Sequence, residues 1–279
     1  MATVTWLGTT DGDWNTGTNW STGSAPADGD TVIFNASSRD VTISSSVDSL
    51  TYAALKVLDG FTGSLGTQGT PLVVNATNLF LATDGAKTHL DGDYTTGHVS
   101  DTPGGVGVTF GSNSTFGTLR VTGGDGTVQV SSSTLTTVQV VGAFDIRLEV
   151  LAAAASFGTL IQDSGTVQTA ESITTADVSG GVLELTTNAG LTTLNLTGSG
   201  SCRHNSTGTI TTANVFDRST ILDLSANSTG TGATVTDVNL YDGEVNERNG
   251  AGNATFTNGI QILGAGVIKA DVARILTVS

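Results

Sequence analysis

Three charged residues in the second half of the chain are spaced as if they belonged to one repeating unit. Glu184, Arg203 and Asp223 recur at almost equal intervals, each in the middle of a short alternating stretch. Stacked units would bring the three side chains into one outward-facing column that could bind a glycan or a protein partner. We favour the other interpretation, a ladder of alternating charge whose members satisfy one another.

Aspartates recur in the pattern Asp-Gly-Asp at 11–13, 28–30 and 91–93. Loop carboxylates can ligate Ca²⁺, so a calcium site is one interpretation of these triplets. The glutamate that completes an EF-hand loop and the glycine-rich nonapeptide calcium repeat do not occur in the sequence. We therefore favour ordinary turn aspartates, and we expect no cofactor apart from the calcium alternative.

The residues needed to cleave a polysaccharide form an incomplete set. Pectin hydrolases use paired aspartates with a Gly-His-Gly segment, whereas His98 has Gly97 before it and Val99 after it. Arg147 and Glu149 would share one face of a strand, but a surface ion pair is the commoner reason for such a pair. The sequence thus predicts a protein that is not an enzyme, with a polysaccharide lyase or hydrolase as the last alternative.

An internal repeat supplies the elements that would position these residues. A phrase of one apolar residue, two small polar residues and an alternating strand begins eight times between positions 116 and 256, at spacings of 16 to 25 residues that average 20. In most units a turn and a second short strand follow. One such unit cannot bury its apolar face alone, whereas stacked units bury it along a continuous column. The phrase begins at Phe116, Leu135, Phe157, Ile173, Leu191, Ile210, Val235 and Phe256.

The repeat predicts an all-β, single-stranded parallel β-helix (a β-solenoid), with a β-sandwich as the competing fold. A right-handed helix is favoured because parallel crossovers are right-handed in most cases. Alternation places Leu194 and Leu196 inside and Asn195 outside. Along the outer face, stacking predicts a ladder of amides and one carboxylate formed by Asp177, Asn195, Asn214 and Asn239.

Cys202 and His204 occupy the core positions that leucines fill one unit earlier. A cysteine is ordinary in a core. The histidine could be a packed imidazole, or it could mark the end of the coils or a partner surface. The repeat places no second histidine or cysteine beside them, so no metal site is expected.

All three tryptophans, Trp6, Trp14 and Trp20, lie close to the start of the chain. We favour an N-terminal cap, because large aromatic side chains close the open end of an apolar column efficiently. A carbohydrate platform built on Trp14 and Trp20 is the alternative. We expect one continuous domain, with the cap and first strands at 1–48, irregular coils with a protruding loop between Asp84 and Gly111 at 49–115, and regular coils at 116–279.

Composition limits the classes of partner. The net charge is −15, with only 10 Lys and Arg. Nucleic-acid binding needs clustered cations, and so does an anionic membrane surface, so neither partner is expected. The N-terminus lacks the basic and apolar segments of a signal peptide, and no run of apolar residues is long enough for a membrane span.

The opening of the chain resembles the start of secreted and autotransporter-like β-helix proteins. The resemblance lies in Trp6-Leu-Gly8, Gly12-Asp-Trp14 and Asn19-Trp20, followed by Pro26 and by Gly29-Asp30 before a strand. A short chain without a leader is more similar to the β-helical structural proteins of tailed-phage particles, and residues 59–66 also look like part of such proteins. The resemblance extends from the start of the chain to Thr70, and beyond that position only the architecture is similar.

The phage resemblance implies a virion structural protein, such as a capsid decoration or fibre component that works by self-assembly and docking. It implies a homo-oligomer, with a trimer favoured, contacts with other virion proteins such as a major capsid protein, and assembly in the host cytoplasm. A surface adhesin or carbohydrate-binding β-helix is the second hypothesis.

Overall fold

The structure is a computed structural model that describes residues 1–82, 85–124, 126–131, 134–142, 146–151, 156–225, 232–247 and 254–270. Its strands pair in parallel and form a β-solenoid of about 11 turns, which confirms the predicted fold class. Among the described residues the only helical segment is the 3-10 turn η1 (Gly17–Asn19). The right-handed sense of the solenoid stays a prediction.

The chain divides into two compact units. The first contains residues 1–136 with 145–149 and 153–155, and the second contains residues 137–144, 150–152 and 156–279. The strands β11 (Thr134–Val140) and β12 (Arg147–Val150) have residues in both units.

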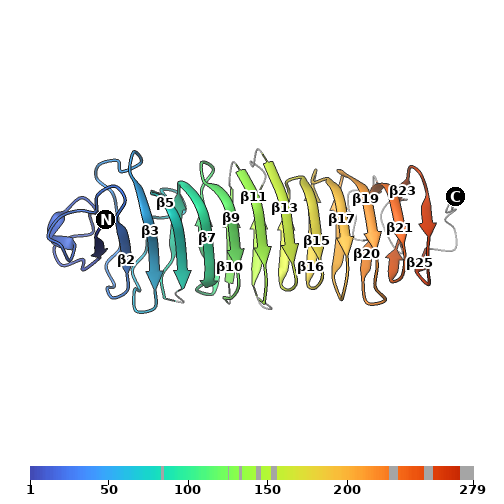
Figure 1. Cartoon of the computed structure of the whole chain (residues 1–279), viewed down its shortest axis with the longest axis horizontal. Helices are drawn as coiled ribbons and strands as arrows, with labels where there is room; N and C mark the ends of the chain where they lie inside the picture. The colour runs from blue at the N-terminus through green and yellow to red at the C-terminus, as the bar shows by residue number, and fades with distance from the viewer. Residues whose placement is uncertain are drawn as a thin grey trace. The chain divides into compact units, whose positions relative to one another are not determined.

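In the first unit, strands that follow one another along the chain alternate between two parallel sheets from β3 on. Figure 1 shows β2, β3, β5, β7 and β9 of one of these sheets side by side. One sheet has the order β1-β2-β3-β5-β7-β9, and the other begins at β4 and continues β6-β8-β10. Its strands are β1 (Thr3–Thr5), β2 (Thr31–Phe34), β3 (Thr51–Leu58), β4 (Leu72–Val73), β5 (Asn75–Ala82), β6 (Thr88–Asp91), β7 (Asp93–Asp101), β8 (Gly105–Phe110), β9 (Thr115–Val121) and β10 (Gly126–Val130).

The second unit repeats this plan with greater regularity. One sheet has the order β13-β15-β17-β19-β21, with β23 and β24 both pairing β21, and the other has the order β14-β16-β18-β20-β22-β25. Its strands are β13 (Ser156–Gln162), β14 (Thr166–Thr169), β15 (Ile173–Val178), β16 (Val182–Thr187), β17 (Leu191–Leu196), β18 (Ser201–Ser206), β19 (Thr209–Val215), β20 (Ile221–Asp223), β21 (Thr234–Leu240), β22 (Glu244–Asn246), β23 (Thr255–Phe256), β24 (Ile260–Ile262) and β25 (Val267–Lys269).

The repeated phrase forms the strands of one sheet, and its two small polar residues have a structural role. In β15, Ile173, Ala176 and Val178 are buried, so two outward positions separate the first pair of core residues. The ladder between β13 and β15 pairs Phe157 with Ile173 but skips the next residue of each strand. The strand therefore breaks its alternation at this point, and small polar side chains suit the break. Leu194 and Leu196 are buried as predicted, with Asn195 outside.

The tryptophan-bearing segment packs as an aromatic cluster at the start of the first unit. Trp20 lies edge-on to both Trp6 and Trp14, with ring centroids 4.9 Å apart in each case. Phe34 of β2 contacts all three rings. Its neighbour in the core is Phe61, 5.1 Å away. The cluster thus continues directly into the apolar column, as expected of an N-terminal cap.

The prediction of a protruding loop between Asp84 and Gly111 is wrong about where such a loop lies. The described residues 85–111 contain β6, β7 and β8, which pair in register with their neighbours. Threonine suits the pleated surface of a sheet. Gly92 provides the positive φ between β6 and β7, and Gly105 provides it where β8 begins. An excursion does leave the coil at residues 66–71, where the backbones of Thr67 and Thr70 hydrogen-bond to each other in both directions at 3.0 Å.

Candidate functional sites: a charged column and a groove

The predicted charged column exists. Strand register pairs Glu184 with Arg203 and Arg203 with Asp223, so the three side chains follow one another on consecutive coils. Arg203 donates from its guanidinium to Glu184 Oε1 at 3.1 Å. The Asp223 carboxylate accepts hydrogen bonds from Ser225 and from Asn246 on the next coil. The three side chains of the column line a shallow hollow of about 360 Å³, together with Gln168, Thr186 and Asn205.

The amide ladder is also confirmed. Asn195 Nδ2 donates to Asp177 Oδ1 at 2.7 Å, Asn214 Nδ2 to Asn195 Oδ1 at 2.8 Å, and Asn239 Nδ2 to Asn214 Oδ1 at 2.8 Å. Each amide thus donates to the coil before it, and Asn195 and Asn214 also accept from the coil after them. Such a chain of hydrogen bonds fixes the register of four coils and has a structural role.

The glycan platform on Trp14 and Trp20 does not fit the structure. Both rings are only 1% exposed, and Trp6 is fully buried. Trp20 Nε1 donates to the Trp14 carbonyl at 2.7 Å inside the cluster. A sugar could stack only on a ring with a free face, and neighbouring aromatic side chains cover these faces.

The Asp-Gly-Asp aspartates accept hydrogen bonds from the protein itself, as turn aspartates do. Asp11 accepts from the Asp13 backbone N–H and from Asn19 Nδ2, and these contacts lower the pKa of its carboxyl. Asp30 accepts from the backbone N–H groups of Ala2 and Ala27, which lowers its pKa in the same way. The other four also accept hydrogen bonds: Asp13 from Asn15 and Ser44, Asp28 from Thr51, Asp91 from Asn113 and Ser114, and Asp93 from Thr115. Within the described residues no group of three metal-ligating side chains occurs.

Cys202 and His204 lie in the core, each with no exposed surface, in register with Leu183 and Leu185. Burial raises the pKa of the Cys202 thiol and lowers the pKa of the His204 imidazole. Neither ring nitrogen of His204 reaches a hydrogen-bond partner among the described residues, and the nearby backbone of Thr234 and Gly208 offsets burial only in part. His204 is therefore a packed, neutral imidazole.

The remaining candidates are structural. Arg147 Nε and Glu149 Oε1 form the expected ion pair at 2.8 Å on β12. Asp145, their neighbour in the sequence, lies outside the described residues. His98 Nε2 lies 2.8 Å from the Thr122 hydroxyl, and its ring packs edge-on against Phe80.

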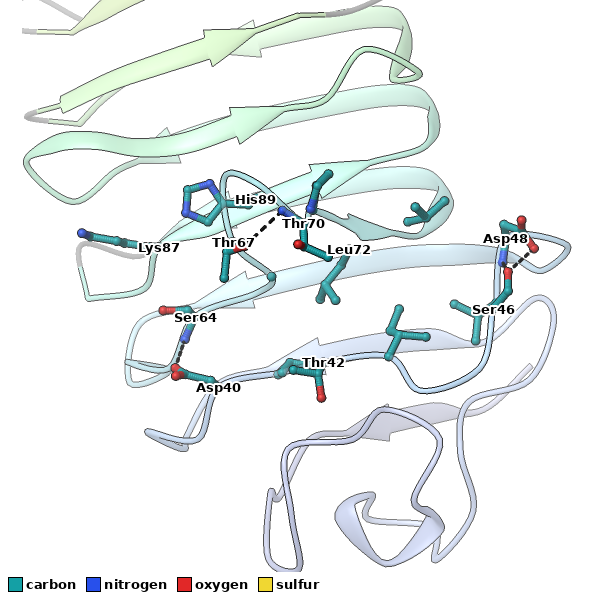
Figure 2. Close-up of a pocket in the computed structure, with 16 residues that line it drawn as sticks. Asp40, Thr42, Ser46, Asp48, Ser64, Thr67, Thr70, Leu72, Lys87 and His89 are labelled. Carbon is teal, nitrogen blue, oxygen red and sulfur yellow. Dashed lines mark hydrogen bonds between the residues drawn. The ribbon is translucent and has the colours of Figure 1, made fainter.

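A groove that the sequence analysis missed lies beside β4 in the first unit (Figure 2). It has a volume of about 640 Å³ and lies between residues 40–48 on one side and residues 64–73 on the other, with Lys87 and His89 at one end. Val41, Val47 and Leu72 are buried in its floor, whereas Val73 is 42% exposed.

Polar contacts hold the ends of the groove. Asp40 Oδ1 accepts from the Ser64 backbone N–H at 2.7 Å, and Ser46 Oγ donates to Asp48 (Figure 2). His89 Nδ1 lies 2.6 Å from the Thr109 hydroxyl, and burial, with a smaller contribution from Lys87, lowers the pKa of its imidazole. An apolar floor with sparse polar groups at the ends is suited to binding a ligand.

One signal in the sequence could have located the groove. The run Gly66-Thr-Gln-Gly-Thr70-Pro71 interrupts the apolar pattern between Leu65 and Leu72. Such a run is a turn signal, and a proline removes a backbone donor from any ladder that it joins. It falls in the part of the chain where the repeated phrase is missing, so register could not be read from spacing.

Comparison of the chain with protein-family models, curated proteins and solved structures finds no match. The parallel strand topology alone defines the class, a β-solenoid with a Trp-bearing cap. No helix among the described residues is long and apolar enough to span a membrane.

Proposed function

We propose that this chain is a non-enzymatic structural component of a phage-like virion, a capsid decoration or fibre protein that works by self-association and docking. The observation that carries the proposal is the amide ladder from Asp177 to Asn239, which joins four coils of a regular parallel stack by side-chain hydrogen bonds. It supports a rigid scaffold, because each coil is fixed by the backbone and again by its side chains. The resemblance of the N-terminal motif supports the same class of protein.

Purified particles test the proposal directly. Virions or prophage particles from the source organism are banded on a density gradient and quantified by mass spectrometry. We expect this chain in the particle band at a constant ratio to the major capsid protein. Its absence from the band would overturn the proposal, as would release of reducing or unsaturated sugar ends by the purified chain from a panel of polysaccharides.

Self-association is the second expectation. Three parallel solenoids can each bury one face against the others, so a trimer is the favoured assembly. Light scattering of the purified chain should give about three times its mass of 28.1 kDa. A monomer at all accessible concentrations would contradict the trimer without bearing on docking to a particle.

A glycan-binding β-helix is the second candidate, and the hollow along the charged column favours it. Planar polar side chains from four coils, Gln168, Glu184, Arg203 and Asp223, face solvent there. A glycan array with the wild-type chain and Arg203→Ala separates the candidates. Binding that the substitution abolishes would favour this second function.

A further inference from the structure

The strand β4 presents a free backbone edge to the groove. Val74 donates its backbone N–H to Asp91 of β6 at 2.8 Å. Successive residues of a strand point their N–H and C=O groups to opposite sides. The N–H and C=O of Val73 therefore point away from β6, toward residues 43–48.

The facing segment presents a second free edge. Thr42 donates its N–H to Gly12 and accepts from the Trp14 N–H, both at 2.8 Å, so its backbone groups point toward the cap. By the same alternation, the N–H and C=O of Ile43 point toward β4. Residues 43–48 and β4 are all described, and no backbone hydrogen bond joins them. Val41 pairs with Leu65, but the backbone pairing between these two coils stops beyond that pair.

The cap holds the ladder open. Ser44 donates to Asp13 from its backbone N–H at 3.0 Å and from its hydroxyl at 2.6 Å. Ser45 donates its N–H to Asn15 Oδ1 at 3.0 Å. These bonds hold residues 44–45 against the Trp-bearing segment at residues 13–15, on the far side from β4. The two edges therefore remain apart, with the apolar floor between them.

Charged side chains lie at both ends of the groove. Lys87 and Asp40 lie at one end and Asp48 at the other (Figure 2). Asp40 Oδ1 already accepts from the Ser64 backbone N–H. Lys87 makes no ion pair within the part of the chain that the structure describes. An occupant with an acidic group near Lys87 and a basic group near Asp48 would complement both ends.

We propose that the groove binds an extended polypeptide segment of a partner protein as an added strand between Ile43 and Val73. A polypeptide fits because the free groups are backbone donors and acceptors, which a strand satisfies in alternation. The exposed side chain of Val73 offers such a strand an apolar contact. The segment is apolar in its middle and carries opposite charges at its two ends. The inference rests on the proposed function, since it names how the solenoid docks on another virion protein.

Two fluorescein-labelled heptapeptides, EVTVTVR and RVTVTVE, test this inference by fluorescence anisotropy with the full chain. They share one composition and differ in which end is acidic. We expect at least one of them to bind with a Kd of about 10–100 μM, in the range of a short segment that orders on binding. The same peptide with N-methylated valines cannot donate its alternate backbone hydrogen bonds and should bind at least about tenfold more weakly.

Substitutions at Val73 provide the matched pair. Val73→Pro removes the edge N–H and should weaken binding at least about tenfold, whereas Val73→Thr keeps the N–H and should bind within about twofold of wild type. If Val73→Pro fails to fold by circular dichroism, the N-methylated peptide on the wild-type chain decides. Failure of both peptides to bind at millimolar concentration overturns the inference, and so does equal binding of the methylated and unmethylated peptides.

The particle experiment separates this inference from the proposed function. If wild type and folded Val73→Pro are incorporated equally, the chain is a virion protein that docks elsewhere, and the inference fails. If the peptides bind but the chain is absent from particles, the groove is a strand-binding site and the proposed virion function fails.

Discussion

At the scale of single residues, His204 is the least conventional choice in the core. It occupies a position that Leu185 fills on the preceding coil, and neither ring nitrogen has a partner among the described residues. Leaving a buried polar group without a hydrogen bond costs about 1–3 kcal/mol. A leucine at this position would fit the same column without that cost.

We predict that His204→Leu raises the free energy of unfolding by about 1–3 kcal/mol and weakens its dependence on pH. Burial lowers the pKa of His204 in the folded chain below its ordinary value of 6.5. As the pH falls below that value, the unfolded chain binds the proton first, so the stability of the wild type falls. Urea denaturation at pH 7.5, 6 and 5 measures both effects.

His89 and His98 remain in that variant, and their pKa values are lowered as well, so the dependence on pH should shrink without vanishing. A variant less stable than wild type at pH 5, or one with an unchanged dependence on pH, would contradict this account of His204. It would point instead to a favourable contact of the imidazole.

At the scale of elements, the question is how much the amide ladder adds to the stability that the stacked apolar side chains provide. Asn214 occupies the middle of the ladder, accepting from Asn239 and donating to Asn195. We predict that Asn214→Ala lowers the free energy of unfolding by about 1–2 kcal/mol, because two partners lose a hydrogen bond. Thr211→Ala, an exposed position on the same strand, is the control and should change it by less than about 0.5 kcal/mol. Equal effects of the two substitutions in urea denaturation would show that the ladder adds nothing beyond the backbone.

How much of the fold the sequence could predict depends on whether the repeated phrase is present. From Phe116 on, the phrase locates first strands, the buried leucines and the outward columns of Glu184 and Asn195 correctly, because aligning the phrase from coil to coil fixes which side chains stack. Before it, period and register are both missing. The same glycine- and threonine-rich composition then suits a strand or a loop, and the loop was predicted in the wrong place.

The candidate site was predictable only in part, for a related reason. Side chains that share a column can be found from spacing, but the groove depends on a ladder that opens. That opening results from Asp13 and Asn15 bonding to Ser44 and Ser45, which are distant in the sequence. No local pattern signals such a contact. The burial of Trp14 and Trp20 likewise depends on packing against Phe34, which composition alone does not specify.

At the scale of the whole molecule, the net charge of −15 opposes association of identical chains. If the chain forms trimers as proposed, their stability should increase as salt screens this repulsion. We predict that raising NaCl from about 20 mM to about 300 mM lowers the dissociation constant of the trimer at least about threefold. Sedimentation equilibrium at the two salt concentrations measures it. A constant that rises with salt would indicate that ion pairs, not apolar contacts, hold the chains together.

The excursion at residues 66–71 has a consequence for how such a chain can change over time. Leu65 pairs with Thr88 and Leu72 with Leu90, so the whole excursion occupies the place that His89 alone fills in the next coil. The stack thus tolerates added length at this corner without loss of register on either side. Gln68 and Gly69 are exposed, and a side chain at Gly69 would meet no neighbour within 4 Å. This tip, at the rim of the groove, is therefore a permissive position at which insertions could diversify what the protein recognises while the coils beneath stay the same.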